Sequence, residues 1–176
     1  MAVPDTQQPL DERGRQQVCD ATVACLRRAG KIFCHDFEPV SVRFDLRGRA
    51  AGMYCVQHGR RSIRYNPWIF ARHTADSLDQ TIPHEVAHYV TDVLYGLRNI
   101  RPHGAEWKAV MHALGAVPRA TGRYDLTGIP VRRQRRFGYR CNCSTHELTT
   151  CRHNRVQRRE AAYVCRYCGA PIVYAG

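Results

Sequence analysis

The sequence predicts an α+β fold over residues 11–126, joined by a basic segment, residues 127–138, to a small cysteine-rich domain over residues 139–176. Strand-like and helix-like apolar periodicities both occur in the first part, which is long enough to bury one core. Cysteines are scattered through that part but crowd the end of the chain, where aliphatic residues are few. So small and polar a segment needs a metal to stabilise its fold.

Three segments of the first part alternate apolar and polar residues, as half-buried strands do. They span residues 40–46, 51–57 and 62–66. A turn at His58-Gly59 is expected to join the last two strands into a hairpin, which Pro67 then ends.

Three further segments have apolar residues at helical spacing. The first covers residues 11–29, with Gly30 as its expected stop. The second covers 76–95 and the third 104–115. Pro83 lies inside the second, so it either kinks this helix or marks where the regular part begins.

The composition indicates a globular chain with polyanionic partners. The formal net charge is +12, from 27 Lys+Arg against 15 Asp+Glu, and every basic residue except Lys31 and Lys108 is arginine. The planar guanidinium can bind two phosphate oxygens at once, so nucleic acid is the first expected partner. No apolar stretch approaches the roughly 18 residues of a membrane span, and the polar N-terminal residues carry no secretory signal. We therefore expect a monomeric cytoplasmic protein without a membrane partner.

A histidine pair in the second predicted helix is the strongest chemical signal. His84 and His88 are four residues apart, so they lie one turn apart on one face and can offer two imidazole nitrogens to one metal ion. Glu85 is placed to accept a proton from a water molecule that attacks a peptide carbonyl. The run His84-Glu-Val-Ala-His88 thus predicts a catalytic zinc site in which Glu85 is the general base.

Such a site requires a third protein ligand, and the residues alone leave its identity open. His103 lies where the chain can fold back after the helix that Gly96 ends. Glu106 is the competitor, since some sites of this kind use a glutamate from a following helix. Asp92, one turn after His88, either hydrogen-bonds a ligand imidazole or faces solvent.

The cysteine-rich domain carries a second metal signature. Cys165 and Cys168 form a C-x-x-C-G turn that points two thiolates at one ion. Cys141 and Cys143 lie upstream at a separation suited to the other half of a zinc ribbon. These four cysteines are the predicted ligands of a structural zinc.

The C-x-C half of this signature leaves an alternative open, because the usual knuckle has two residues between its cysteines. His146 or His153 can replace one thiolate of the pair. Cys151 is expected to remain a free thiol.

Two clusters of arginines are candidates for nucleic-acid contact. One falls in the basic segment and the other inside the cysteine-rich domain, where tyrosines that can stack on bases lie nearby. The candidates are Arg132, Arg133, Arg135, Arg136, Arg152, Arg155, Arg158 and Arg159.

Ordered motifs along most of the chain resemble bacterial proteins of the SprT family. The resemblance implies a zincin-like (SprT-like) metallopeptidase domain followed by a zinc ribbon, with His84, His88 and His103 as zinc ligands and Glu85 as the general base. Eukaryotic relatives, the Spartan-type proteases, digest proteins crosslinked to DNA and are switched on by DNA. The motifs are Asp45-Leu-Arg-Gly-Arg-Ala-Ala-Gly, Ile63-Arg-Tyr-Asn-Pro, Thr81-Ile-Pro-His-Glu-Val-Ala-His, Arg101-Pro-His-Gly-Ala-Glu-Trp-Lys, Tyr139-Arg-Cys, Arg152-His-Asn-Arg-Val and Tyr163-Val-Cys-Arg-Tyr-Cys-Gly.

Two functional hypotheses follow from these features. The first is a zinc-dependent endopeptidase that cleaves proteins associated with or crosslinked to DNA. The alternative is a nucleic-acid-binding zinc-ribbon regulator whose metallopeptidase core is vestigial. The complete His84, Glu85 and His88 set favours the enzyme, because a vestigial site has no reason to keep its general base.

Overall fold

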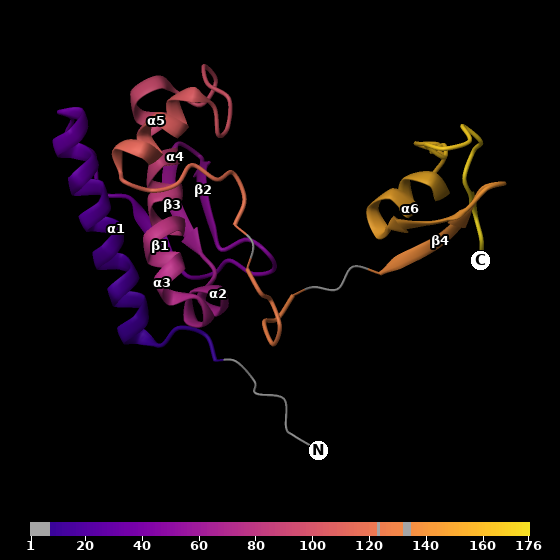
Figure 1. Cartoon of the computed structure of the whole chain (residues 1–176), viewed down its shortest axis with the longest axis horizontal. Helices are drawn as coiled ribbons and strands as arrows, with labels where there is room; N and C mark the ends of the chain where they lie inside the picture. The colour runs from indigo at the N-terminus through magenta and orange to yellow at the C-terminus, as the bar shows by residue number, and fades with distance from the viewer. Residues whose placement is uncertain (1–7, 123, 132–134) are drawn as a thin grey trace. The chain divides into compact units, whose positions relative to one another are not determined.

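The computed structural model describes residues 8–122, 124–131 and 135–176, in two compact units, Met1–Val131 and Arg132–Gly176 (Figure 1). The chain is a mixed α+β protein, as predicted. None of the helices in these described ranges is both long enough and apolar enough to cross a membrane.

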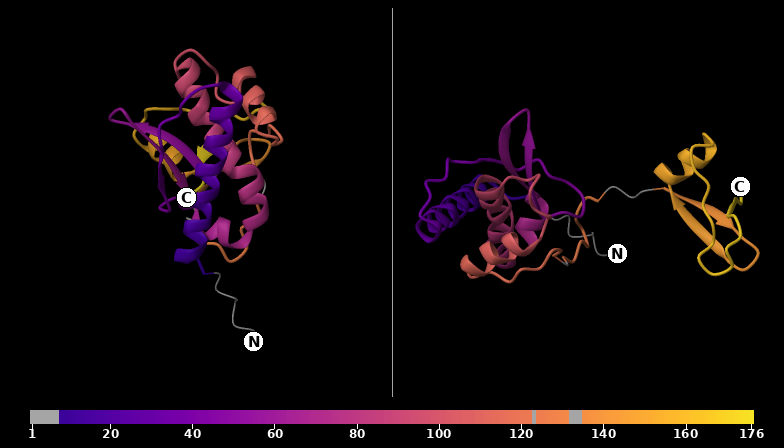
Figure 2. Two further views of the ribbon diagram at one scale, coloured as in Figure 1. Left: turned by 90° about the vertical axis from the view of Figure 1, so that its left-hand side faces the viewer. Right: turned by 90° about the horizontal axis from the view of Figure 1, so that it is seen from above.

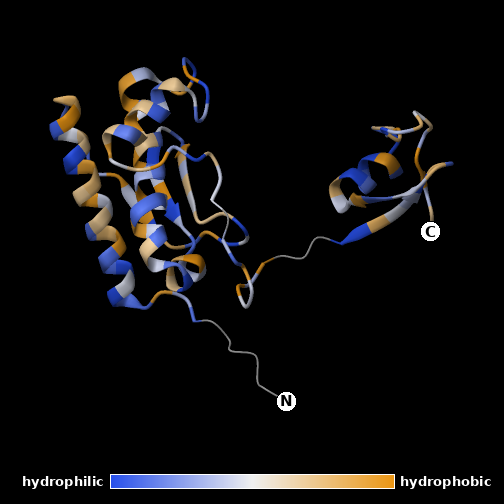
Figure 3. Ribbon diagram, viewed as in Figure 1, coloured by the Kyte–Doolittle hydropathy of each residue, from blue (hydrophilic) through white to orange (hydrophobic). Residues whose placement is uncertain are grey.

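Helix α1 (Glu12–Phe33) packs its apolar stripe against α4, and hydrophilic and hydrophobic residues alternate along it (Figure 3). Asp11 caps it by accepting a hydrogen bond from a backbone N–H of the first turn. The predicted stop at Gly30 is wrong, because the helix continues to Phe33 and ends at Cys34, which takes a left-handed φ of 48°. Gly30 instead allows the returning chain to pass close by, since a Cβ there would lie 3.1 Å from the His35 carbonyl oxygen.

The sheet of the first unit has the strand order β1-β3-β2. Strand β1 (Ser41–Arg43) runs parallel to β3 (Arg60–Tyr65), and β2 (Gly52–Gln57) is antiparallel to it. The predicted hairpin turn is confirmed: His58 and Gly59 have φ values of 50° and 74°, the positive pair that a tight two-residue hairpin requires. Strand β1 is shorter than predicted, because only three of its residues pair with β3.

Pro67 does more than end the hairpin, because it opens a helix that the sequence did not predict. Helix α2 (Pro67–Arg72) has Pro67 in its first turn, where the missing N–H costs nothing. The Asn66 side chain caps it by accepting hydrogen bonds from the N–H groups of Trp68 and Ile69.

The second predicted helix is formed, but its N-terminal part is irregular. After α3 (Thr74–Asp76) comes a π-helical turn, η1 (Ser77–Thr81), and only then the regular helix α4 (Ile82–Tyr95). Pro83 therefore lies in the first turn of α4, so the regular helix begins at the proline rather than continuing through it.

Helix α4 is the central element of this unit. It contacts β2, β3, α1 and α5 (Ala105–Ala113), and Figure 2 shows the β2–β3 hairpin as a layer distinct from the helices. The core between these elements is apolar and fully buried. Its largest members are Trp107, Tyr65, Phe70, Ile63, Ile82, Met111, Leu114, Val18, Val86 and Val90.

The second unit is a small three-stranded sheet with one helix. Its strand order is β5-β4-β6, all antiparallel, and the helix follows β5 directly. The elements are β4 (Arg136–Arg140), β5 (Thr145–Thr149), α6 (Thr150–Gln157) and β6 (Val173–Tyr174).

Parts of the predicted basic segment 127–138 lie in each of the two units. Ile129 is buried against Ala51 and Ile69, so the chain still belongs to the first unit there. Strand β4 begins at Arg136, and Phe137 stacks on His153 of α6.

Candidate functional site

The two histidines of α4 point to the same place, as their spacing predicts. The Nε2 atoms of His84 and His88 are 3.3 Å apart. Burial, together with the neighbouring histidines, lowers the pKa of both rings, to about 4 for His84 and about 3 for His88. Both imidazoles are therefore neutral near pH 7, which is the form that binds a metal.

His103 joins the pair from the turn that precedes α5. It takes a left-handed φ of 56°, and its Nε2 lies 3.1 Å from the Nε2 of both His84 and His88. Among the described side chains, the three histidines form a group that could hold a metal ion, and Glu106 does not belong to it.

The geometry of the three nitrogens fits zinc. Three nitrogens bound at about 2.05 Å to one tetrahedral zinc ion lie about 3.3 Å apart. The observed separations are 3.1, 3.1 and 3.3 Å. A neutral imidazole has one N–H, so hydrogen bonds alone cannot align three ring nitrogens on one point, and the arrangement is one that could hold a metal ion.

The Trp107 side chain packs against all three imidazoles. Its ring centroid lies 4.7 Å from those of His84 and His103 and 5.5 Å from that of His88. Its indole N–H donates to the His84 carbonyl oxygen at 3.3 Å, and only 1% of its surface is exposed. One buried side chain of α5 thus contacts all three rings.

A Trp107→Ala variant should therefore lose both stability and metal affinity. Truncating a buried tryptophan costs about 3–5 kcal/mol in the free energy of unfolding, and the three rings lose their common support. Urea denaturation and zinc titration measure the two effects. Wild-type zinc affinity in this variant would show that Trp107 does not support the three histidine rings.

Glu85 lies on the face of α4 that turns toward β2. Its side chain is only 5% exposed, and its Oε2 accepts a hydrogen bond from the Tyr54 N–H at 2.7 Å. Burial raises the pKa of its carboxyl to about 8, although the bond from Tyr54 opposes that rise. A cation held by the neighbouring histidines would lower this pKa again.

Gly52 makes room for this carboxylate. A Cβ at this position would lie 2.6 Å from both Cγ and Oε1 of Glu85. A glycine in a strand often marks such a close approach, and this was the signal available in the sequence.

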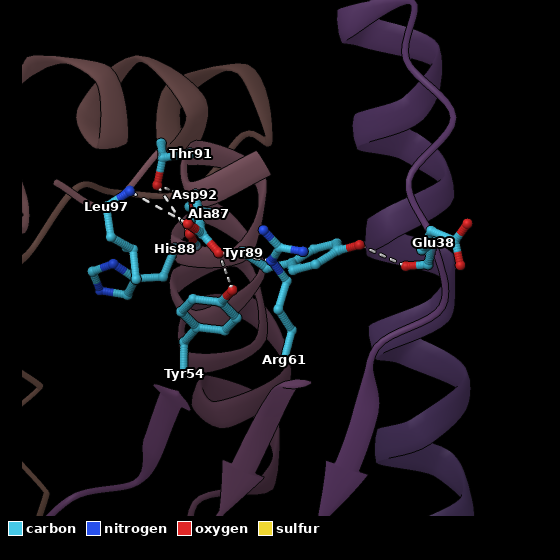
Figure 4. Close-up of polar contacts among 9 residues, drawn as sticks. All are labelled: Glu38, Tyr54, Arg61, Ala87, His88, Tyr89, Thr91, Asp92 and Leu97. Atoms are coloured by element: carbon cyan, nitrogen blue, oxygen red, sulfur yellow. Dashed lines mark hydrogen bonds and ion pairs between the residues drawn. The ribbon is translucent and has the colours of Figure 1, made fainter. Parts of the chain in front are cut away.

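Asp92 does neither of the two things expected of it. It does not face solvent, since only 8% of its surface is exposed. The donors to its carboxylate are Tyr54, Arg61 and Leu97, and none of them is a histidine (Figure 4). Its Oδ2 accepts from the Tyr54 hydroxyl at 2.6 Å and from Arg61 Nε at 2.7 Å. Burial acts to raise its pKa, but these hydrogen bonds outweigh burial and hold the pKa below its usual value.

A cleft of about 790 Å³ opens beside His84 and Glu85. One part of its lining is the segment 119–122 together with Tyr124, whose hydroxyl is 2.6 Å from that of Thr81. Arg119 of this segment and His84 line the same cleft.

The second unit brings its four predicted cysteines together. The Sγ–Sγ distances are 3.5 Å for Cys141–Cys143, 3.6 Å for Cys143–Cys165 and 3.8 Å for Cys141–Cys168. Thiolates bound at about 2.3 Å to a tetrahedral zinc lie about 3.8 Å apart. These cysteines form the other group, among the described residues, that could hold a metal ion.

The two histidines considered as replacements have other positions. His146 Nε2 lies 3.2 Å from the Cys141 Sγ, outside the group of four, and this hydrogen bond lowers the pKa of the thiol to about 5. His153 stacks on Phe137 at 3.7 Å and hydrogen-bonds the Tyr139 hydroxyl through Nδ1, so it belongs to the core of this unit.

The candidate arginines are spread over the surface of the second unit. Arg152 and Arg155 lie on α6, where Arg152 stands over the Tyr163 ring, and Arg135 stands over the Phe137 ring. Arg158 pairs with Glu160 at 2.8 Å. Arg135, Arg136, Arg152, Arg155, Arg158 and Arg159 are all exposed, whereas Arg132 and Arg133 lie outside the described residues.

Comparisons with known proteins agree with the motifs. A model of the SprT-like family matches residues 22–135. Protein SprT of Vibrio parahaemolyticus is 39% identical over 155 residues, covering 88% of this chain and 90% of that protein. Protein SprT of Actinobacillus succinogenes is 34% identical over 146 residues (82% of each), and that of Klebsiella pneumoniae strain 342 is 39% identical over 137 residues (77% and 78%). No solved structure matches. Since the family model covers more than half of the chain and these bacterial relatives align with most of it, the chain belongs to the SprT family.

Proposed function

We propose that this protein is a zinc-dependent endopeptidase with a zincin-like catalytic domain. His84, His88 and His103 would hold the catalytic zinc, and Glu85 would be the general base. The observation that carries this proposal is the convergence of three ring nitrogens within 3.3 Å of one another, with a buried carboxylate next to the first of them on the same helix.

The chemistry divides between the metal and the protein. Zinc bound at this site would supply a Lewis acid that activates water near neutral pH and polarises a peptide carbonyl. Glu85 accepts the proton of the attacking water and passes it to the leaving amine as the C–N bond breaks. The Tyr54 N–H orients the carboxylate, and burial keeps the Glu85 carboxylate basic enough to accept a proton.

The cleft supports a polypeptide substrate. Its volume of about 790 Å³ lies within the usual range of ligand sites, and both His84 and Glu85 line it. Two segments of its lining, residues 49–52 and 119–122, consist mostly of small residues. Such segments leave room for the backbone of an extended peptide.

We further propose that Cys141, Cys143, Cys165 and Cys168 hold a structural zinc. The thiol separations of 3.5–3.8 Å support this, and so does the small size of the unit they staple. Apart from the cysteines, its core consists of few side chains, chiefly Tyr139, Leu148 and His153.

DNA is the proposed partner of the second unit, and the proposed substrates are proteins bound or crosslinked to DNA. The net charge of the whole chain is +12, and the six exposed candidate arginines of this unit can supply phosphate contacts. Tyr167, which is 91% exposed beside the cysteine cluster, adds a surface on which a base can stack. Binding through this unit would bring the cleft to proteins on DNA in the bacterial cytoplasm.

The test compares cleavage of one DNA-binding protein, free and bound to DNA. Each reaction is run with and without a zinc chelator. We expect cleavage that requires zinc and is at least about tenfold faster when the substrate is on DNA, because recruitment raises its effective concentration. Equal cleavage of free and DNA-bound substrate would remove the DNA part of the proposal. DNA binding with no cleavage under any condition would favour the regulator with a vestigial core.

A further inference from the structure

Two buried carboxylates of α4 face the same strand. Glu85 and Asp92 are seven residues apart, which is two helical turns, so they lie on one side of the helix. Strand β2 packs along that side. The histidines occupy the adjacent face, so the Glu85–Asp92 side is available to position the carboxylate rather than to bind metal.

Tyr54, in the middle of β2, contacts both carboxylates. Its backbone N–H donates to Glu85 Oε2 at 2.7 Å, and its side-chain hydroxyl donates to Asp92 Oδ2 at 2.6 Å. Figure 4 shows the Tyr54 side chain reaching along α4 to Asp92. One residue is thus fixed at two points that lie two turns apart on the helix.

Asp92 is itself held firmly. Arg61 Nε donates to its Oδ2 at 2.7 Å, and the Leu97 N–H donates to its Oδ1 at 3.3 Å. Arg61 belongs to β3 and pairs with Val56 of β2, so both strands of the hairpin are bound to the same carboxylate. The Tyr54 hydroxyl therefore bonds to a group with little freedom to move.

Strand β2 also approaches Glu85 at Gly52. At Gly52, two residues from Tyr54, the backbone approaches Glu85 so closely that a single Cβ would lie 2.6 Å from its carboxylate oxygen. Strand β2 therefore lies next to the Glu85 side chain at two positions, Gly52 and Tyr54.

We propose that Tyr54 is a positioning residue for Glu85, in which the hydroxyl, bonded to Asp92, holds the residue's own backbone N–H on the carboxylate. The inference rests on the proposed function for its catalytic meaning. Tyr54 does not touch the substrate or the reacting atoms, and it acts only through Glu85.

The test is a Tyr54→Phe variant, which keeps the ring and the backbone N–H but loses the bond to Asp92. We expect hydrogen exchange of the Tyr54 amide to become about tenfold faster, because the strand is released from the helix. We also expect kcat to fall about tenfold with KM within twofold of wild type, since a misplaced base slows the chemical step without weakening substrate binding.

Tyr89→Phe is the matched control. Tyr89 is a buried tyrosine of α4, the helix that carries Glu85 and Asp92. Its ring lies edge-on to that of Tyr54, with the ring centroids 6.0 Å apart. Its hydroxyl donates to the Glu38 carbonyl oxygen at 2.8 Å, away from Glu85 (Figure 4). This variant loses one tyrosine hydrogen bond but should leave Tyr54 amide exchange and kcat as they are in wild type.

Asp92→Asn gives a second route to the same contact. It weakens the bonds from Tyr54 and Arg61 without altering β2, so it should also speed exchange of the Tyr54 amide and lower kcat. The inference would be overturned if the amide of residue 54 exchanged at the wild-type rate in both Tyr54→Phe and Asp92→Asn. Faster amide exchange with unchanged kcat would also overturn it. If the wild-type chain cleaves nothing, the proposed function fails, and amide exchange alone still decides whether Tyr54 is held through Asp92.

Discussion

A Glu85→Gln variant should lose about 10³-fold in kcat or more while it keeps its fold and its zinc. General-base catalysis contributes about 10²–10⁴-fold, and an amide cannot accept the proton. The substitution preserves shape, and the amide oxygen can still accept the Tyr54 N–H that bonds to Oε2 in wild type. Single-turnover cleavage, zinc content and thermal unfolding measure the three quantities.

Glu106→Gln is the control for that experiment. It makes the same change of carboxyl to amide on the neighbouring helix, outside the histidine group. Its cleavage rate should stay within about threefold of wild type, as expected for a group without a role in the chemistry. Near-normal cleavage by the Glu85 variant would exclude the proposed base.

A Cys165→Ser variant should lose the structure of the second unit and leave the first intact. Cys165 is buried and lies 3.6 Å from Cys143, and a serine hydroxyl does not replace a thiolate as a zinc ligand. A structural zinc contributes about 10 kcal/mol or more to the fold of so small a unit. Amide exchange should show loss of protection in β4, β5 and α6, with protection in α4 unchanged.

Cys151→Ser provides the comparison. Cys151 is an exposed cysteine of α6 that lies outside the group of four, so this variant should retain zinc and protection throughout the second unit. If Cys165→Ser kept full protection in β4 and β5, the unit would fold without its metal, and the structural role of the cysteines would be wrong.

Local periodicity predicts the parts of the site that lie on one element. The spacing of His84 and His88 is a property of a single helix, and the structure places their Nε2 atoms 3.3 Å apart. The C-x-x-C-G turn is equally local, and its two cysteines join the cluster as predicted. A helix or a turn fixes these side chains before any tertiary contact is considered.

Contacts between distant segments were beyond the reach of such patterns. The role of Trp107 depends on α5 packing under α4, and the bond from Tyr54 to Glu85 joins residues 31 positions apart. Asp92 was expected to hydrogen-bond a ligand imidazole or to face solvent, but its carboxylate is bonded by Tyr54 and Arg61 of the hairpin. A periodicity says which face of an element is buried, and it does not say which strand buries it.

Two further differences between prediction and structure concern the end of α1 and the helix α6, which the sequence did not predict. Gly30 was expected to stop α1 because glycine is common after helices, yet the left-handed residue that ends this helix is Cys34, and Gly30 lies one turn earlier, close to the His35 carbonyl oxygen. Helix α6 lies in a segment of high polarity, and its one buried residue, His153, gives no periodic signal. Stacking of His153 on Phe137 stabilises that helix from outside.

The most direct test of the catalytic site is zinc stoichiometry in wild type and in a His103→Ala variant, with His112→Ala as the control. His112 is an exposed histidine of α5 outside the cluster. We expect two equivalents of zinc in wild type and in His112→Ala, and one equivalent in His103→Ala, because two imidazoles alone cannot retain the ion against a competing chelator. Two equivalents in His103→Ala, retained against the same chelator, would contradict a metal held jointly by His84, His88 and His103.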